Sequence, residues 1–404
     1  MKKRIFIAIH YLEIGGAEMS LIGLLQSFDY SKIEVDLFIY RHQGEFLAMI
    51  PKEVNVLPEI PTYAQIEAPL KESIQEGFWR IAYGRLKAKL EHQQFMKHNH
   101  PVDGGAIFGY IAKDVAPYLP DINPDTTYDL AISFLMPHNI VLQKVKAKKK
   151  ACWIHTDYTK VAVNADLELP IWGGYDHIVS ISEEVTASFL KVFPTLKDKI
   201  VLIENILSEK FVRKRANLYE NTSQLDRHII SLLSVGRFSY AKNYDNVPDI
   251  CKRINSQLST LNYPLRVRWY IIGFGGDEAL IRQKIQEAGM EDHVIILGKK
   301  SNPYPYIKAC DIYVQPSRYE GKSVTVREAQ ILCKPVIVTN YTTAPSQIKD
   351  GIDGVIVPME NAKCADGIVD FIKNKDLQSQ IIDYLQTHHY GNEEEVEKVY
   401  QLYS

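Results

Sequence analysis

The sequence predicts an α/β protein built from two doubly wound, Rossmann-like domains. Short β-branched runs alternate with helical patterns along almost the whole chain, which is typical of parallel sheets covered by helices on both faces. The runs fall into two sets, and 404 residues are enough for two domains. The expected strands are residues 4–9, 35–40, 128–134, 151–155 and 176–181 in the first set, and 228–234, 267–272, 293–297, 311–314, 335–339 and 354–357 in the second.

Helical patterns follow most of these strands, and a further helical region interrupts the first set. That region, residues 73–90, carries apolar side chains and is followed by a loop rich in glycine and proline. It is either an insertion that builds a surface specific for one substrate or a plain packing helix. The other expected helices are residues 17–28, 183–193, 277–288, 324–332 and 361–373.

The expected boundaries follow from where the pattern stops. Residues 1–206 form the first domain, and residues 207–227 are polar, show no sustained period and are expected to be a linker. Residues 228–391 form the second domain. In residues 392–404 an asparagine precedes three glutamates and an apolar stripe at helical spacing, which predicts an N-capped helix.

Composition favours an ordinary globular protein of the cytoplasm. The formal net charge of −2 provides no overall field that would attract nucleic acid. Five cysteines, an odd number without a Cys-x-x-Cys pair, fit reduced thiols. The apolar run at residues 5–9 is short, which fits a first strand better than a signal peptide. No stretch approaches the roughly 20 apolar residues that span a bilayer.

The most informative stretch of the chain is residues 316–328. Glu320 and Glu328 are separated by seven residues, one in a loop after an apolar strand and one in the following helix. Free backbone N–H groups at the start of that helix favour an anion, while a carboxylate can accept hydrogen bonds from hydroxyls. Phosphate and hydroxyls together suit a sugar nucleotide. The residues expected to provide the amides are Gly321, Lys322, Ser323 and Val324.

Each carboxylate also has a purely structural interpretation. Thr325 and Glu328 have the spacing of a capping box, in which the glutamate would serve only the helix end. Glu320 would then be a surface acid beside Arg318.

A second candidate site lies at residues 234–242, where an expected strand runs into a loop. Gly236 marks a tight turn, and Arg237 and Lys242 follow it. A departing nucleoside diphosphate needs fixed positive charge, and the sequence has no Asp-x-Asp motif that would hold a metal ion for this purpose. Arg237 and Lys242 are therefore expected to stabilise the leaving group without a metal. The alternative is that both are solvated surface charges, as loop cations usually are.

The spacing of Glu320 and Glu328, together with the Gly-Arg…Lys pair, resembles that of retaining, nucleotide-sugar-dependent glycosyltransferases of the family-four type. This resemblance implies the GT-B architecture, in which two Rossmann-like domains face a central cleft and the last helix crosses back onto the first domain. It also implies that the second domain holds the donor and the first domain the acceptor. The chain departs from the usual wording after the first glutamate, where Gly-Lys-Ser-Val-Thr replaces Gly-Phe-Gly-Leu-Pro. The identity of the sugar therefore stays open.

The resemblance also assigns roles to residues of the first domain. Gly15 and Gly16, between the first strand and its helix, are implied to lie over the donor diphosphate. His155, at the end of an expected strand, is implied to face the cleft and, with Arg237, Lys242 and Glu320, to act in catalysis. Taken alone, the glycines would indicate only a turn, and a lone histidine at a strand end usually has a structural role or is exposed.

We therefore expect a retaining glycosyltransferase that needs no cofactor. Its substrates would be a UDP- or GDP-linked sugar and a saccharide or lipid-linked acceptor in cell-surface polysaccharide synthesis. A sugar-nucleotide epimerase of the same fold and a non-catalytic sugar-nucleotide-binding protein remain alternatives. Five lysines within residues 144–150 are either a solvated helix end or a contact with anionic lipid at the inner face of the membrane.

Overall fold

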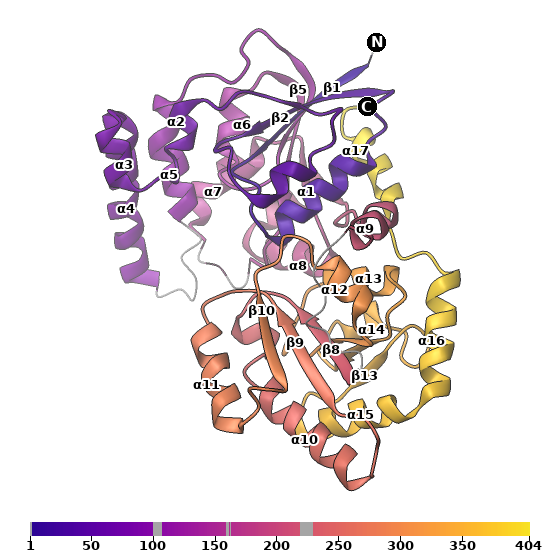
Figure 1. Ribbon diagram of the computed structural model, residues 1–404. Coiled ribbons are helices and arrows are strands. Elements are labelled where there is room, and N and C mark those ends of the chain that lie inside the picture. The colour runs from indigo at the N-terminus through magenta and orange to yellow at the C-terminus, as the bar shows by residue number, and fades with distance from the viewer. Residues whose placement is uncertain (1, 100–106, 159–160, 162, 219–228) are drawn as a thin grey trace. The chain divides into compact units, whose positions relative to one another are not determined.

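The computed structural model describes residues 2–99, 107–158, 161, 163–218 and 229–404. The chain divides into two compact units, each with its own parallel sheet (Figure 1). Unit 1 comprises Met1–Ile206 and Glu393–Ser404, and unit 2 comprises Leu207–Asn392.

The sheet of unit 1 is doubly wound. Its described strands pair in parallel in the order β3-β2-β1-β4-β5-β6-β7, so the chain starts near the middle and winds first to one edge and then to the other. The strands are β1 (Lys3–Ile9), β2 (Ile33–Ile39), β3 (Asn55–Val56), β4 (Tyr128–Ser133), β5 (Ala147–Ile154), β6 (His177–Ser180) and β7 (Ile200–Leu202).

Helices connect these strands, as parallel pairing requires. The α-helices of unit 1 are α1 (Gly16–Ser27), α2 (Pro61–Ala64), α3 (Leu70–Gln75), α4 (Trp79–Asn99), α5 (Ile107–Val115), α6 (Asn139–Lys144), α7 (Ala165–Gly173), α8 (Glu183–Val192) and α17 (Val396–Gln401). Shorter 3-10 helices are η1 (Glu45–Met49), η2 (Ala116–Tyr118), η3 (Pro194–Lys199) and η5 (Glu393–Glu395).

Unit 2 repeats the architecture with the strand order β10-β9-β8-β11-β12-β13, again parallel throughout the described pairs. Its strands are β8 (Ile230–Val235), β9 (Val267–Ile272), β10 (Val294–Gly298), β11 (Ile312–Gln315), β12 (Val336–Thr339) and β13 (Val355–Val357). Its helices are α9 (Glu209–Ala216), η4 (Tyr240–Lys242), α10 (Val247–Thr260), α11 (Glu278–Ala288), α12 (Tyr304–Ala309), α13 (Val324–Ile331), α14 (Ala344–Gln347), α15 (Asn361–Lys373) and α16 (Lys375–Thr387).

Burial of the central strand on both faces explains the continuous apolar sequences of unit 2. All six residues of β8 are buried, including two serines, and the hydroxyl of Ser234 accepts a hydrogen bond from Trp269 Nε1 at 2.9 Å. Helices α10 and α15 cover the sheet with residues such as Leu258 and Ile368. A strand with helices on both sides needs apolar residues at consecutive positions, so its sequence does not alternate.

The predicted fold class is confirmed, and every expected strand is present, with the predicted bounds in β9 and with one or both ends shifted in the others. The largest shift is in β5, which begins at Ala147 rather than at residue 151. Strands β3 and β7 were not predicted, because two and three residues are too few to show a pattern. The helical region expected at residues 73–90 is two helices, since Gly77, with a φ of 84°, lies in the break between α3 and α4.

The expected linker and the expected last helix both differ from the prediction in detail. Residues 209–216 of the expected linker form α9, which buries Phe211 and Val212 within unit 2, while residues 219–227 lie outside the described residues. Asn392 is not the N-cap residue of α17, which is Glu395, and its Oδ1 accepts a hydrogen bond from Leu207 N at 2.9 Å. The last helix itself is assigned to unit 1, where the Tyr400 hydroxyl accepts a hydrogen bond from Asp29 N at 2.8 Å.

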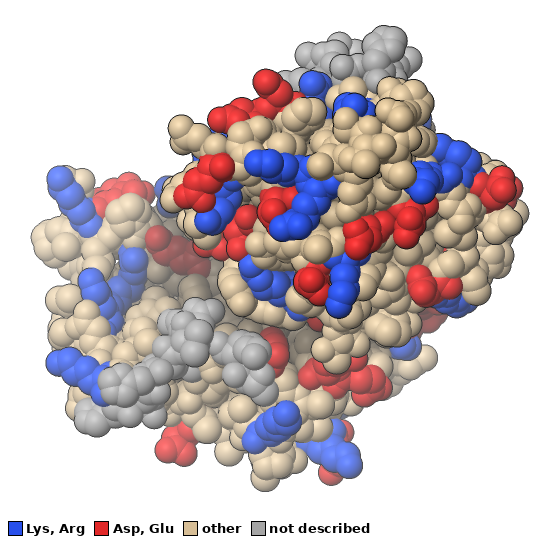
Figure 2. All heavy atoms as spheres, turned by 90° about the horizontal axis from the view of Figure 1, so that it is seen from below, with Lys and Arg blue, Asp and Glu red and all other residues tan. Residues whose placement is uncertain are grey.

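Two further features bear on where the protein acts. Among the described residues, none of the helices combines the length and the apolar character that crossing a bilayer requires. On the face drawn in Figure 2, basic and acidic side chains are interspersed, as expected for a chain with 47 basic and 49 acidic residues.

The packing of α10 gives a matched pair of variants. Replacing Leu258, which is fully buried, by alanine removes apolar contacts and leaves a cavity, so unit 2 should lose about 2–5 kcal/mol of unfolding free energy. Leu261→Ala, at the exposed end of the same helix, should change the free energy by less than about 0.5 kcal/mol. Urea unfolding of both variants measures the difference, and equal losses would contradict the assigned burial.

Candidate functional site

The two motifs singled out in the second half of the sequence lie side by side in unit 2. Strand β8 pairs in parallel with β11, so the loops after both strands leave the same edge of the sheet. Arg318 ties these loops together: its backbone N–H donates to Ala241 O at 2.8 Å, and its guanidinium forms two bonds of 2.9 and 2.6 Å with Asp245. In open parallel sheets ligands bind at this carboxyl edge.

Lys242 and Glu320, one from each loop, form an ion pair at the carboxyl edge. Lys242 Nζ lies 2.5 Å from Glu320 Oε1, and both side chains are largely buried. The same oxygen also accepts hydrogen bonds from Ser317 Oγ at 2.6 Å and from Gln315 Nε2 at 3.0 Å. Glu320 Oε2, in contrast, makes no hydrogen bond with a described residue. Glu320 is thus held in place through one oxygen, and the other can accept from a ligand.

Arg237 lies on the same loop but in a different environment. Its side chain is exposed and has no hydrogen-bond or ion-pair partner within the described part of the chain. Gly236 before it cannot carry a side chain easily, because a Cβ there would lie 2.8 Å from the hydroxyl oxygen of Tyr244. This hydroxyl is buried and has no hydrogen-bond partner among the described residues. The sequence predicted Arg237 and Lys242 as equivalent cations, whereas the structure pairs only Lys242.

The start of α13 is open to an anion. Ser323 is the N-cap residue, yet its side chain makes no capping hydrogen bond, and its Oγ instead contacts Thr325 Oγ1 at 3.1 Å. Gly321 and Lys322 before it are exposed, and Val324 begins the helix. The backbone amides of a helix start without a side-chain cap carry the positive end of the helix dipole, which favours negative charge.

Glu328 points into unit 2 and is 3% exposed. Its Oε1 accepts a hydrogen bond from the Tyr304 hydroxyl at 2.8 Å, while Oε2 makes no hydrogen bond with a described residue. Burial raises the pKa of this carboxyl to about 7, and the Tyr304 hydrogen bond opposes part of the rise. The capping-box interpretation is wrong, because the helix begins at Val324 and Thr325 is already inside it.

The remaining predicted residues belong to unit 1. Gly15 is the N-cap of α1 in an extended conformation, and a Cβ there would collide with the Glu18 carboxylate. Gly16 is exposed and has open space around it. Their place after β1 is the equivalent of the Gly236 loop after β8, at the carboxyl edge of a parallel sheet.

His155 follows β5 and is held as a neutral imidazole. Its ring packs against Phe134 at 4.8 Å between centroids, and Nε2 is buried without a hydrogen-bond partner among the described residues. Burial lowers the pKa of His155 to about 4, although a hydrogen bond with the backbone of Phe134 opposes the shift. The ring is therefore uncharged at neutral pH.

Unit 1 also has a polar pocket that sequence reasoning missed. It has a volume of about 180 Å³ and lies where β1 and β2 end. His10 and Glu67 are hydrogen-bonded to each other in its wall, and Arg41 lies beside them. These residues are far apart in the sequence and show no motif. The parallel pairing of β1 with β2 brings His10 and Arg41 to one edge of the sheet, and Glu67 joins them from the segment after α2.

The lysine cluster at residues 144–150 is not a helix end, because residues 147–150 lie in β5 and only Lys144 ends α6. Lys148 Nζ pairs with Asp129 at 2.8 Å and Lys149 Nζ with Asp176 at 3.3 Å. Lys150 Nζ donates to the carbonyl of Leu142 at 2.6 Å. Much of the charge of this cluster is therefore balanced within unit 1.

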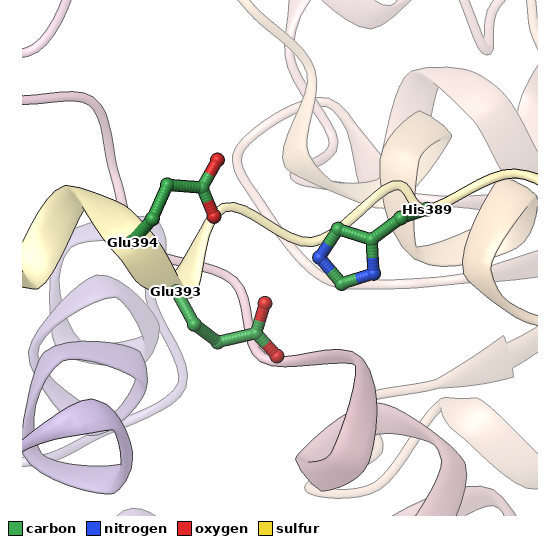
Figure 3. A group of neighbouring side chains, drawn as sticks. All are labelled: His389, Glu393 and Glu394. Carbon is green, nitrogen blue, oxygen red and sulfur yellow. The ribbon is translucent and has the colours of Figure 1, made fainter.

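One group of side chains has ligands that suit a metal ion. His389, Glu393 and Glu394 come from one short stretch, and their ligand atoms lie within 4.8 Å of one another (Figure 3). His389 Nδ1 already lies 3.3 Å from Glu209 Oε1, and His389 and Glu394 are exposed. Exposed acidic groups of this kind are common without an ion, and the group contains none of the predicted site residues.

Several residues that build the unit 2 site gave no signal in the sequence. Tyr304 holds Glu328, and Ser317 and Gln315 hold Glu320. Asp245 fixes the loop through Arg318. All of them act on other side chains. Tyr304 and Asp245 contact residues more than 20 positions away in the sequence, and Gln315 and Ser317 reach Glu320 only because their side chains turn toward it.

Comparison with protein families decides how this site is classified. Residues 218–388 match the family model described as Glycosyl transferases group 1. Unit 2 belongs to this family. All the predicted residues of unit 2, from Gly236 to Glu328, lie within the matched segment of this glycosyltransferase domain.

Curated relatives point the same way. The chain is 27% identical over 206 residues to the amylovoran biosynthesis glycosyltransferase AmsD of Erwinia amylovora, covering 46% of this chain and 56% of that one. It is 28% identical over 177 residues to a 41.2 kDa protein of the cps region of Klebsiella pneumoniae, covering 43% and 46%. The matches thus span about half the length of these relatives.

Solved structures extend the likeness to the whole chain at the level of the fold. Anabaena HepE, in complex with UDP and glucose, has a TM-score of 0.67 and 13% identity, covering 99% of this chain and 98% of that one. Staphylococcus aureus TarM has a TM-score of 0.63 and 14% identity, covering 100% and 99%. The two Rossmann-like sheets therefore form the GT-B fold, as the resemblance in the sequence implied.

The raised pKa of Glu328 predicts an unusual dependence of stability on pH. Because the folded-state pKa of about 7 exceeds the ordinary value of 4.5, the folded protein binds more protons than the unfolded chain between these values. The unfolding free energy of unit 2 should therefore decrease as the pH rises from 4.5 to 7. Glu328→Gln keeps an acceptor for Tyr304 but does not titrate, so it should be more stable than the native protein above pH 7 by about 1–3 kcal/mol.

Urea unfolding at pH 5 and pH 8 measures this gap, which should close at the lower pH. Tyr304→Phe provides the matched test. Losing the hydroxyl should raise the pKa of Glu328 further, so the pH range over which the unfolding free energy decreases should extend to higher pH. A gap that is the same at both pH values would show that the Glu328 carboxyl is not desolvated.

Proposed function

We propose that this protein is a retaining glycosyltransferase that moves a sugar from a UDP- or GDP-linked donor to a saccharide or lipid-linked acceptor in cell-surface polysaccharide synthesis. The observation that carries the proposal is the pair of carboxylates in unit 2. Glu320 and Glu328 are each held through one oxygen, and in each the second oxygen has no hydrogen bond with a described residue. Between them lies the uncapped start of α13.

This arrangement matches the parts of a sugar nucleotide. Glu328 would accept hydrogen bonds from the ribose hydroxyls, each contributing about 1.5–3 kcal/mol net for a charged acceptor. The amides of residues 321–324 would bind the distal phosphate, and Glu320 would contact the transferred sugar. Support for this donor class comes from HepE, which shares the fold and whose structures contain UDP and UDP-glucose.

Arg237 and Lys242 would supply positive charge as the donor bond breaks. The bond between the anomeric carbon and the diphosphate oxygen breaks with both electrons going to the diphosphate, whose charge the two cations and the α13 amides would balance. Lys242 has three N–H donors, so its bond to Glu320 leaves others for phosphate. The acceptor oxygen then bonds to the same face of the anomeric carbon, and its proton passes to the leaving phosphate.

Unit 1 would contribute to the acceptor side. His155 is neutral at physiological pH, and its Nε2, which is buried without a hydrogen-bond partner among the described residues, would accept from a sugar hydroxyl that reaches it. Gly15 and Gly16 would let the backbone approach the diphosphate. The pocket beside His10, Arg41 and Glu67 provides polar groups for a saccharide acceptor.

The proposed site of action is the cytoplasm, with peripheral contact at the inner face of the membrane when the acceptor is lipid-linked. The lysines of residues 144–150 give this contact little support, since they are largely paired.

A panel of UDP- and GDP-sugars tests the proposal directly. The full chain is first screened for thermal stabilisation, because a ligand at 100 times its Kd adds about 2.7 kcal/mol. Release of nucleoside diphosphate and transfer to a saccharide acceptor are then measured, and the product anomer is determined by NMR. A donor whose sugar is changed without transfer would favour an epimerase. Binding without either reaction would favour a sugar-nucleotide-binding protein, and an inverted anomer would overturn the retaining mechanism.

Variants of the two cations test the assignment of charge stabilisation. Arg237→Ala and Lys242→Ala should each lower kcat by about 10²–10³, because a fixed positive charge aimed at the leaving group is lost. Arg282→Ala, which removes an exposed cation paired with Glu278 on α11, should leave kcat unchanged. Equal losses in all three variants, or an unchanged kcat in Arg237→Ala, would contradict the assignment.

Chelation tests whether these cations act without a metal ion. If Arg237, Lys242 and the α13 amides balance the diphosphate, turnover should survive an excess of EDTA. The control is the same assay with added Mg²⁺ or Mn²⁺, which should raise the rate by less than about twofold. Activity that disappears on chelation and returns with either ion would show that charge balance depends on a metal.

A further inference from the structure

Helix α4 presents a row of large apolar side chains to solvent. Trp79, Tyr83, Leu86 and Leu90 are 64%, 61%, 49% and 59% exposed. Their spacing of four, three and four residues places them within an arc of about 60°, given roughly 100° per residue in an α-helix. We call these four residues the outer stripe. In Figure 1, α4 lies beside α3 and α5 at the edge of unit 1.

The outer stripe is not needed to hold α4 on unit 1. The opposite side of the helix is packed: Ile81, Ala82 and Ala88 are buried, and a Cβ on Gly84 would lie 2.5 Å from the carbonyl of Asp114 on α5. A helix on the surface of a globular unit usually has a polar outer face. Here a second apolar face lies opposite the first, and contiguous exposed apolar groups of this kind mark an interaction surface.

Basic side chains flank the outer stripe. Arg80 lies on one side, Lys89 on the other, and Lys97 continues the row at its far end; all three are exposed and have no ion-pair partner among the described residues. The nearest acid on the helix, Glu91, is already paired with Lys87 and Lys113. The surface is therefore apolar along its middle and positive at its margins.

We propose that the outer stripe docks α4 onto an anionic phospholipid surface, with the helix lying in the plane of the headgroups. An interfacial helix inserts its apolar face to the boundary of the acyl chains while its basic residues contact lipid phosphates. Tryptophan and tyrosine favour this boundary because each has an apolar ring and one polar group. This contact is a property of unit 1 and does not depend on the proposed transfer reaction.

A second copy of the chain fits this surface less well. The spacing of the outer stripe would suit a pair of helices, but the margins would then bring Arg80 and Lys89 of one copy close to the same basic residues of the other. Helix pairs are stabilised by opposite charges at the flanking positions and destabilised by like charges. A lipid surface of negative charge has no such conflict.

Trp79 provides a specific probe of docking. The chain has four tryptophans, and the other three, Trp153, Trp172 and Trp269, are buried. A shift in tryptophan emission on contact with lipid should therefore come from Trp79. Trp79→Phe keeps an apolar ring but should abolish the shift.

The experiment mixes the full chain with vesicles of phosphatidylcholine that contain about one third phosphatidylglycerol, and with vesicles of phosphatidylcholine alone. With the anionic vesicles we expect a blue shift of emission, quenching by brominated lipid, and co-sedimentation that weakens at high salt. The double variant Trp79→Ser/Leu90→Ser should lower the partition coefficient by about tenfold or more. The double charge variant Arg80→Glu/Lys89→Glu should remove the preference for phosphatidylglycerol.

A matched control removes exposed apolar groups elsewhere. Leu261→Ser/Leu280→Ser, on the exposed ends and faces of α10 and α11 in unit 2, should sediment with vesicles like the native protein. Circular dichroism should show unchanged folding in Trp79→Ser/Leu90→Ser and in Leu261→Ser/Leu280→Ser, because all four substituted positions are exposed.

Three results would overturn the proposal. One is no emission shift with anionic vesicles; another is binding that the outer-stripe variant does not weaken. The third is a dimer in analytical ultracentrifugation that Trp79→Ser/Leu90→Ser dissociates while vesicles stay unbound, which would assign the stripe to a second copy. Transfer to a soluble saccharide acceptor is measured in the same variants. This measurement does not involve a membrane, so a failure of lipid docking can be told apart from a failure of the proposed transfer activity.

Discussion

The parallel pairing of β8 with β11 is the constraint on which the unit 2 site depends. These strands are about 80 residues apart in the sequence, yet pairing sends both of their following loops to one edge of the sheet. Only this arrangement lets Lys242 meet Glu320 and lets Arg318 join Asp245. The sheet therefore converts two distant loops into one charged surface, and the start of α13 completes it.

Burial gives the two carboxylates of this surface different properties. Glu320 is paired with a lysine and receives two further hydrogen bonds, so its charge is balanced locally. Glu328 receives one hydrogen bond, from Tyr304, and burial raises its pKa to about 7. A buried carboxylate with a single donor is under-solvated, so two further hydroxyl donors from a ligand would stabilise its charged form. The destabilisation of unit 2 and the affinity for a diol would then have the same origin.

Much of this organisation could be predicted from the sequence, because it depends on patterns that act over short distances. Continuous apolar runs indicated the strands, and the positions of Arg237 and Glu320 after such runs indicated the edge of the sheet at which the loops after β8 and β11 lie. The roles of Tyr304, Gln315 and Asp245 could not be predicted, since each contributes through a contact with another side chain. Helix α9 was missed for a related reason: its three buried residues, Phe211, Val212 and Ala216, are too few to show a period in a polar segment.

The lysines at residues 144–150 show that a clear sequence pattern can also suggest a role that the structure does not support. A run of like charge suggested a surface for lipid, but β5 places two consecutive lysines, Lys148 and Lys149, beside Asp129 and Asp176, which neutralise them. The row on α4 was weaker as a pattern, because apolar residues on two faces of a helix blur the period. Only the exposure of each side chain in the structure separates the packed face from the outer one. Charge in a sequence therefore indicates a partner only after the structure shows which charges are already balanced.

The loop after β9 explains why the site surface can be rigid before a ligand binds. Gly273 and Gly275, both with a φ of 155°, pack against the loop after β8 so closely that a Cβ on Gly273 would lie 1.9 Å from Gly236 O. The backbone N–H of Phe238 donates to the carbonyl of Phe274 at 2.8 Å in the same contact. Because Arg318 N also donates to Ala241 O, backbone contacts join the loops after three neighbouring strands, β9, β8 and β11. Arg237 lies on the middle loop, the one after β8. A cation on such a support loses little freedom when a diphosphate arrives, so more of its attraction is available to stabilise the charge that develops.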